Sequence, residues 1–287
     1  MIQAWFVVYA VITGALLLAA FGLQVVCRLG LRGIGEWFGR APGLDLWIAY
    51  FTIAPMIGGP IALAQTTADG GVPVWLRALL GFVAGALAMA TALVVWCRVH
   101  ELMNRRHVRG PRIVRHLNKA VGPLNNHFAL WWTTIALPTF ASIRIAQIVV
   151  YPVLTWTIRL PKYKTGEWVN VSRYKFEGLV GHDLVWCLYC DWMTGLWSLG
   201  SEMLRNLESF WCPIRFYPDK KCENCVLDFP DIDGGWVPAD GSMADVVGVL
   251  EEKVPGPGGE NPWFGHPARL TVEGESPVVP RESADRA

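Results

Sequence analysis

Three long stretches in the first hundred residues carry no charged side chain. They cover residues 2–27, 46–68 and 78–97. Each approaches or exceeds the roughly 20 apolar residues that an α-helix needs to cross a hydrocarbon core about 30 Å thick. Backbone polar groups inside lipid must be satisfied within the segment, so we expect each stretch to be a membrane-spanning helix. The sequence therefore predicts an all-α integral membrane protein with a three-span domain over residues 1–97.

Charge is divided unevenly along the chain. Through Lys175 there are 17 Lys or Arg against 5 Asp or Glu, and after it there are 8 against 19. Arginines are dense in the loop 98–126, where Glu101 is the sole acid. Under the positive-inside rule this loop is cytoplasmic, which places the N-terminus outside the cytoplasmic (inner) membrane. The basic residues adjoin apolar spans rather than aromatic side chains of a soluble face, so we expect no nucleic-acid partner.

Small residues and prolines mark two of the predicted spans as packing surfaces. The second span contains Pro55 and the run Gly58-Gly59-Pro60, which must be supported by neighbouring protein because proline interrupts the hydrogen bonds of a helix. The third span has Gly81 and Gly85 four residues apart, a spacing that lets two helices approach closely. Besides the lipid bilayer, we expect other membrane subunits as partners through the Gly81/Gly85 face, although an internal contact would also explain it.

Residues 127–160 form a fourth apolar segment, interrupted by Pro138, Arg144 and Pro152. A fourth span is one interpretation, but it would place the following basic residues outside, against the charge rule. We therefore expect two half-length helices in a re-entrant or interfacial hairpin, which leaves the C-terminal domain cytoplasmic.

The remainder predicts a small α-rich soluble domain over 161–250 and a disordered Pro-, Gly- and Glu-rich tail over 251–287. Alternation in 162–181 favours a short hairpin or strand. A helix is expected from Asp183, a good N-cap residue, to Leu207, and a last short helix over 242–253.

Two C-x-x-C pairs give the strongest chemical signal. Cys187 and Cys190 precede Cys222 and Cys225 by about thirty residues, and Cys212 lies between the pairs as a substitute ligand. Four thiolates at this spacing suit a tetrahedral zinc site or, alternatively, an iron–sulfur centre. On a helical wheel the first pair shares the polar side with Arg205, away from the apolar stripe. Inert packed thiols and a thiol–disulfide redox pair are the competing interpretations.

No phosphate-binding glycine loop, nucleophile elbow or H-E-x-x-H pair is present in the sequence, so no catalytic signature identifies an enzyme. We expect an accessory or scaffolding membrane subunit with a domain stabilised by a four-cysteine metal site. The alternative is a membrane-bound redox protein that uses the same cysteines for electron transfer or thiol–disulfide exchange. A transporter component ranks lower because the three spans hold no ionisable side chain.

Overall fold

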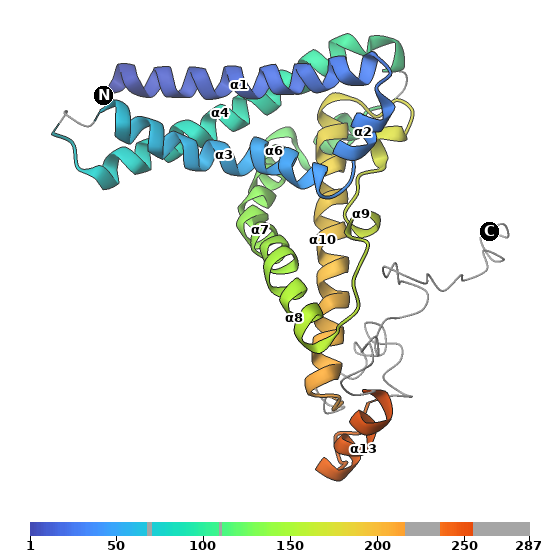
Figure 1. The fold of residues 1–287 in the computed structure, drawn as a ribbon. Helices are drawn as coiled ribbons and strands as arrows, with labels where there is room; N and C mark the ends of the chain where they lie inside the picture. Colours follow the sequence, from blue (N-terminus) through green and yellow to red (C-terminus); the bar gives the residue numbers. More distant parts are fainter. Residues whose placement is uncertain (68–70, 109–110, 216–235, 255–287) are drawn as a thin grey trace. The chain divides into compact units, whose positions relative to one another are not determined.

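The computed structural model describes residues 1–67, 71–108, 111–215 and 236–254. These residues form helices joined by turns and, between residues 158 and 181, by a longer and partly extended connection (Figure 1). Over the described ranges the β-structure consists of two isolated bridges and no strand. This confirms the predicted all-helical fold.

Two compact units make up the chain. Unit 1 comprises Met1–Thr133 and Val169–Trp192, and unit 2 comprises Thr134–Trp168 and Met193–Ala287. Residues 161–250, predicted to be one soluble domain, are thus divided between the two units. The described residues do not show that soluble domain.

Four helical segments are long and apolar enough to cross a membrane. Three of them match the predicted spans: α1 (Ile2–Arg28), α3 (Gly43–Thr66) and α4 (Val74–Met103). The fourth is Pro123–Ile158. Between 17% and 33% of the residues in the apolar windows are buried within the structure. Most of the remaining side chains are therefore left to contact lipid, which is the pattern of a membrane protein.

The Pro123–Ile158 segment differs from the predicted hairpin. Its helical turns follow one another without a non-helical residue, as α6 (Pro123–Trp132), the 3-10 turn η2 (Thr133–Ala136), α7 (Leu137–Ile145), the π-helical turn η3 (Ala146–Val150) and α8 (Tyr151–Ile158). The prolines do not separate two half-length helices because Pro138 and Pro152 lie in the first turns of α7 and α8. A first-turn proline is tolerated, since the N–H that it lacks would have no partner inside its own helix.

In unit 1, α3 and α4 approach each other most closely at glycines. A Cβ atom on Gly59 would overlap the carbonyl oxygen of Gly81, and one on Gly85 would overlap that of Pro55. The Gly81/Gly85 face therefore packs on α3 of the same chain, as the internal alternative expected. A second subunit would have to use another surface, and its presence stays a prediction.

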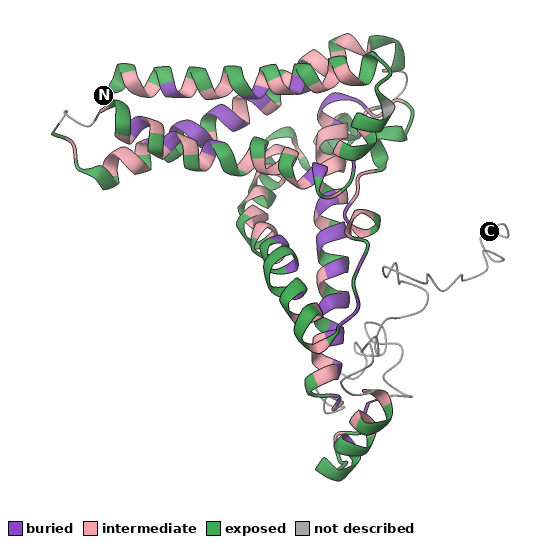
Figure 2. Cartoon of the chain, in the orientation of Figure 1, coloured by how far each residue is buried: buried purple, intermediate pink, exposed green. Residues whose placement is uncertain are grey.

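Polar side chains fasten α1 to this pair of helices. The indole Nε1 of Trp5 donates to the carbonyl oxygen of Leu80 at 2.8 Å, and the Tyr9 hydroxyl lies 2.9 Å from Thr91 Oγ1. Buried Val8, Leu63 and Ala84 pack together beside these bonds. The three helices thus share one apolar core, and their outer faces stay exposed and apolar (Figure 2).

The stretch 162–181 forms no hairpin. It contains the short helix α9 (Thr165–Trp168) and the 3-10 turn η4 (Arg173–Lys175). Its extended part pairs with the turn that follows α2 (Arg32–Phe38): Asn170 and Arg40 form an isolated antiparallel bridge, and Ala41 N donates to Val169 O at 2.9 Å. The alternating residues therefore meet a single turn rather than a partner strand.

Unit 2 contains the C-terminal half of α10 (Gly181–Trp211), which packs on α7 and η3. Gly200 allows this contact, because a Cβ atom there would lie 3.3 Å from Ile143 and 3.4 Å from Gln147. The last described helix, α13 (Met243–Lys253), begins at a capping box formed by Ser242 and Asp245, which confirms the predicted final helix. All but the first four residues of the predicted tail lie outside the described residues.

Unit 2 buries several charged side chains and exposes large apolar ones, which is unusual for a water-soluble protein. The charged residues Arg144, Glu202 and Arg205 are 7%, 2% and 3% exposed, whereas Trp156 and Leu204 are 82% and 61% exposed. Exposed apolar surface of this kind is stable against lipid or against another apolar protein surface. Arg205 was predicted to share a water-facing side with the cysteines, and its burial corrects that prediction.

Candidate functional site

The predicted metal ligands are only partly within the described residues. Cys187 and Cys190 lie one turn apart on α10 in unit 1, half-buried and exposed respectively, and Cys212 follows the end of that helix. Cys222 and Cys225 lie outside the described ranges. Within those ranges, no group of three or more His, Cys, Asp or Glu side chains is placed to hold a metal ion. The four-cysteine site therefore stays a prediction.

The Cys187 thiol is not tuned to be a nucleophile. Burial raises its pKa and the neighbouring Cys190 raises it further, which together exceed the opposing effect of Arg173. Arg173 is itself neutralised, since its Nε lies 2.8 Å from a carboxylate oxygen of Asp191. Reactive cysteines have a lowered pKa in an electropositive setting. The surroundings of Cys187 thus give no support to the thiol–disulfide alternative.

A buried ion-pair network joins three segments of unit 1. Arg112 Nη2 lies 2.9 Å from Glu101 Oε1 on α4, and Arg112 Nε lies 3.1 Å from Asp183 Oδ2 on α10. Arg112 Nη2 also donates to the Val180 carbonyl oxygen at 3.0 Å. The side chains of Arg112, Glu101 and Asp183 are 13%, 20% and 5% exposed, so these bonds are largely shielded from water.

Asp183 caps a different helix from the one predicted. α10 begins at Gly181, which has a φ of 59° and no room for a Cβ atom beside Glu101. The Asp183 carboxylate instead accepts hydrogen bonds from the backbone N–H groups of Ile113 and Val114, both at 3.1 Å. These are the first residues of α5 (Ile113–Val121), where a negative charge is favoured by the free N–H groups of the helix.

The pKa of Asp183 reflects these contacts. Burial raises the pKa, but interactions with His182 and Arg112 and with the Val114 N–H outweigh burial and lower it to about 2. His182 Nδ1 lies 3.6 Å from Asp183 Oδ1, a separation beyond hydrogen-bond length, so we give Arg112 and the backbone donors the larger share. Asp183 is therefore a permanent anion at neutral pH and acts as a structural group.

A cavity of about 320 Å³ lies beside this network in unit 1. We call this cavity the interface pocket. Leu93, Val94 and Cys97, from the last apolar turns of α4, line one part of it. Trp131 and Trp186 form aromatic walls, with ring centroids 5.4 Å apart and planes nearly perpendicular. The polar part includes Arg98, Arg112, Arg115, His127 and His182, with Glu101 as its acidic member. The pocket thus combines an apolar, an aromatic and a cationic lining.

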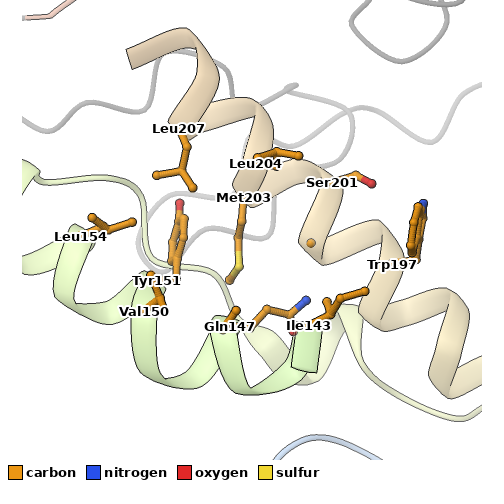
Figure 3. A pocket seen from close by; sticks show the side chains of 12 residues that line it. Ile143, Gln147, Val150, Tyr151, Leu154, Trp197, Ser201, Met203, Leu204 and Leu207 are labelled. Carbon is orange, nitrogen blue, oxygen red and sulfur yellow. The ribbon is translucent and has the colours of Figure 1, made fainter. Parts of the chain in front are cut away.

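A second cavity, of about 310 Å³, lies in unit 2 between α10 and the helical turns of α7, η3 and α8. We call it the groove (Figure 3). Its lining carries no charged residue: Ile143, Val150 and Leu154 come from one side, and Trp197, Leu204 and Leu207 from α10. Gln147, Tyr151 and Ser201 are the polar members.

The buried charged groups of unit 2 bond to one another or to polar neighbours. Gln147 accepts from Arg144 Nη1 at 3.0 Å and donates to the Leu196 carbonyl oxygen at 2.9 Å. Arg205 Nη1 lies 3.3 Å from Glu202 Oε2. Asn206 donates to the Tyr163 hydroxyl, whose pKa is raised by burial. Pairing inside the unit leaves the groove itself neutral.

The sequence analysis did not predict the buried ion pairs of either unit. Glu101 was visible as the one acid in a basic loop, a signal that it neutralises a specific arginine. The burial of Glu202 and Arg205 had no such signal, because an i, i+3 charged pair usually lies on a solvated helix face.

Comparison with known proteins gives no further assignment. No family model, no curated protein and no solved structure matches this chain.

Proposed function

We propose that this chain is an accessory or scaffolding subunit of a membrane complex, and that the groove of unit 2 receives an apolar helix of a partner subunit. The observation that carries the proposal is the groove itself, uncharged and about 310 Å³ in volume, on a unit that buries Arg144, Glu202 and Arg205. A charged lining would have suited a polar ligand, whereas this lining suits an apolar one.

The choice of a helix rather than lipid tails rests on the composition of the groove. Small Gly200 and Ser201 lie between the large Trp197 and Leu204. Small residues at helix interfaces in membranes let backbones approach and are characteristic of helix–helix packing. Trp197 is 59% exposed and Leu204 61% exposed, and large side chains of this kind are the ones that fill a partner's surface.

The metal site belongs to the same proposal. Cys187, Cys190, Cys222 and Cys225 would bind zinc, with Cys212 as a substitute ligand and an iron–sulfur centre as the alternative. The support for this is the spacing of the two C-x-x-C pairs. A metal cross-link between α10 and the following segment would stabilise the chain beyond the end of that helix.

Orientation is proposed from the basic loop. The arginines of 98–126 place that loop on the cytoplasmic side and the N-terminus outside in a cytoplasmic membrane. The ion pair between Arg112 of this loop and Asp183 supports placing the start of α10 on the same side of the membrane as the loop.

Photo-crosslinking in native membranes tests the proposed docking. A benzophenone amino acid is placed at Trp197 or Leu204 and, as matched controls, at Val11 or Leu18, which are 64% and 73% exposed on the outer face of α1. The proposal predicts an adduct of one discrete protein mass from both groove positions and none from the α1 positions. Lipid adducts alone, equal at all four positions, would contradict it.

A further inference from the structure

We infer that the interface pocket of unit 1 binds the anionic headgroup of a membrane lipid. The inference concerns a different unit from the groove and does not depend on a partner subunit. Its basis is the combination of apolar, aromatic and cationic residues that line one cavity of about 320 Å³.

The apolar part of the pocket belongs to a helix that is apolar enough to cross a membrane. Leu93, Val94 and Cys97 precede the first charged residue of that region, Arg98, on α4. Val94 is 52% exposed, so the pocket adjoins the outer apolar surface of the helix. A ligand with acyl chains can therefore place its tails against the lipid-facing side of α4 while its headgroup reaches the polar part.

The aromatic part suits the depth of lipid headgroups. Tryptophan concentrates at the boundary between hydrocarbon and water because its ring is apolar and its N–H is polar. Trp131 from α6 and Trp186 from α10 meet edge to face in the lining of the pocket. The two indoles thus line the same cavity as the apolar residues of α4 and the cations.

The cationic part of the pocket contains positive charge that its carboxylates do not neutralise. Arg112 is held by Glu101 and Asp183, but Arg98 is 77% exposed and lies 3.6 Å from Glu101, a weak pair at an exposed position. Across the described chain no carboxylate is paired with Arg115, which is exposed. Two arginines are therefore available for a phosphate group, and His127 and His182 lie beside them with ring centroids 5.3 Å apart.

The histidines of the basic loop, His100, His107 and His116, are not those in the pocket. His100 accepts a hydrogen bond from Gly181 N at 3.1 Å and is half-buried, so it holds the start of α10 in place. His107 and His116 do not line the pocket. The histidines that line the pocket are His127 and His182, which belong to two helices far apart in the sequence.

A free phosphate and a lipid phosphate share this chemistry, and the measurement separates them. Purified full-length chain in mild detergent is titrated with phosphatidylglycerol, phosphatidylcholine or inorganic phosphate, and bound ligand is counted by native mass spectrometry. The test variant is Arg98→Gln/Arg115→Gln. The matched control is Arg105→Gln/Arg106→Gln, which removes the same charge from the same loop at exposed positions outside the pocket. Neither variant removes Glu101, Arg112 or Asp183, so the buried network stays intact.

Phosphatidylglycerol is expected to bind more tightly than phosphatidylcholine. Each arginine near an anionic headgroup is worth about fivefold in affinity, so the test variant should bind phosphatidylglycerol about 25-fold more weakly. The control should weaken it less than about threefold. If both variants lose the same affinity for phosphatidylglycerol, the lipid is attracted to the basic surface in general and the pocket is not its binding site. If inorganic phosphate binds as tightly as phosphatidylglycerol and loses the same affinity in the test variant, the assignment of the ligand as a lipid is wrong.

Discussion

Asp183→Asn should destabilise unit 1 without disturbing its spans. The wild-type carboxylate accepts three hydrogen bonds near 3.1 Å, from Arg112 Nε and from the N–H groups of Ile113 and Val114. The amide side chain keeps one acceptor atom, so it can satisfy part of this set, and it leaves the buried Arg112 with Glu101 as its one remaining anion.

The expected magnitude follows from those contacts. Removing one partner from a buried pair costs about 3–5 kcal/mol. Arg112 retains Glu101 and the Val180 carbonyl oxygen. The loss should therefore fall at the lower end, about 3 kcal/mol for Asp183→Ala and about 2 kcal/mol for Asp183→Asn.

Sodium dodecyl sulfate titration of protein in mixed micelles, followed by circular dichroism, measures this loss. Glu36→Gln is the matched control, because Glu36 is exposed and within the described residues has no ion-pair partner. That variant should change the unfolding free energy by less than about 0.5 kcal/mol. If Asp183→Asn unfolds at the same detergent fraction as wild type, the network does not hold α4, α5 and α10 together.

Other parts of the chain give four further predictions. Gly85→Leu should separate α3 from α4, because a Cβ atom there overlaps the Pro55 carbonyl oxygen, and the variant should aggregate on size-exclusion chromatography. Gly14→Leu on α1 is the control, since an added Cβ atom there would have no neighbour within 4 Å, and it should leave the elution profile unchanged. The pKa of Asp183 is lowered from 3.8 to about 2, so the stabilising effect of its charge is complete above about pH 4 and is lost as the pH falls through about 2. An acid titration of the unfolding midpoint should therefore show that wild type loses stability over this pH range and that Asp183→Asn loses less. Ser242→Ala removes the side-chain bond to Asp245 N and should weaken α13 by about 1 kcal/mol, seen as faster amide exchange confined to that helix. Metal analysis by mass spectrometry should find about one zinc per chain, lost in both Cys187→Ser and Cys222→Ser, because a tetrahedral site does not survive the loss of a thiolate; an unchanged zinc content in either variant would remove that cysteine from the site.

The membrane helices were predictable because lipid imposes a single requirement along the whole helix. Uncharged stretches of sufficient length identified α1, α3 and α4, with ends displaced by a few residues. The Pro123–Ile158 run was harder, since Arg144 and two prolines suggested interruption. Arg144 is instead bonded to Gln147 and only 7% exposed, a tertiary contact that local sequence does not reveal.

The two cavities were not predictable from the sequence. The interface pocket combines residues from α4, α5, α6 and α10, and the separations along the chain reach from Leu93 to Trp186. The helical wheel of α10 correctly predicted the burial of Leu196, Leu199 and Met203, but it was wrong for Leu204 and Arg205 because it assumed water on one side. In unit 2 Glu202 and Arg205 are buried, whereas Leu204 is exposed. Amphipathic periodicity indicates the buried side only where the outside is water.

Filling the groove tests the proposed subunit role most directly. Ser201→Trp places an indole in the groove, and Ser198→Trp places the same side chain at an exposed position of α10 that does not line it. Native mass spectrometry of complexes released from membranes into nanodiscs then reports whether a partner mass accompanies the chain. We predict that wild type and Ser198→Trp retain one partner of fixed stoichiometry and that Ser201→Trp loses it. Retention of the partner by Ser201→Trp, or a wild-type chain that carries no partner, would contradict the account.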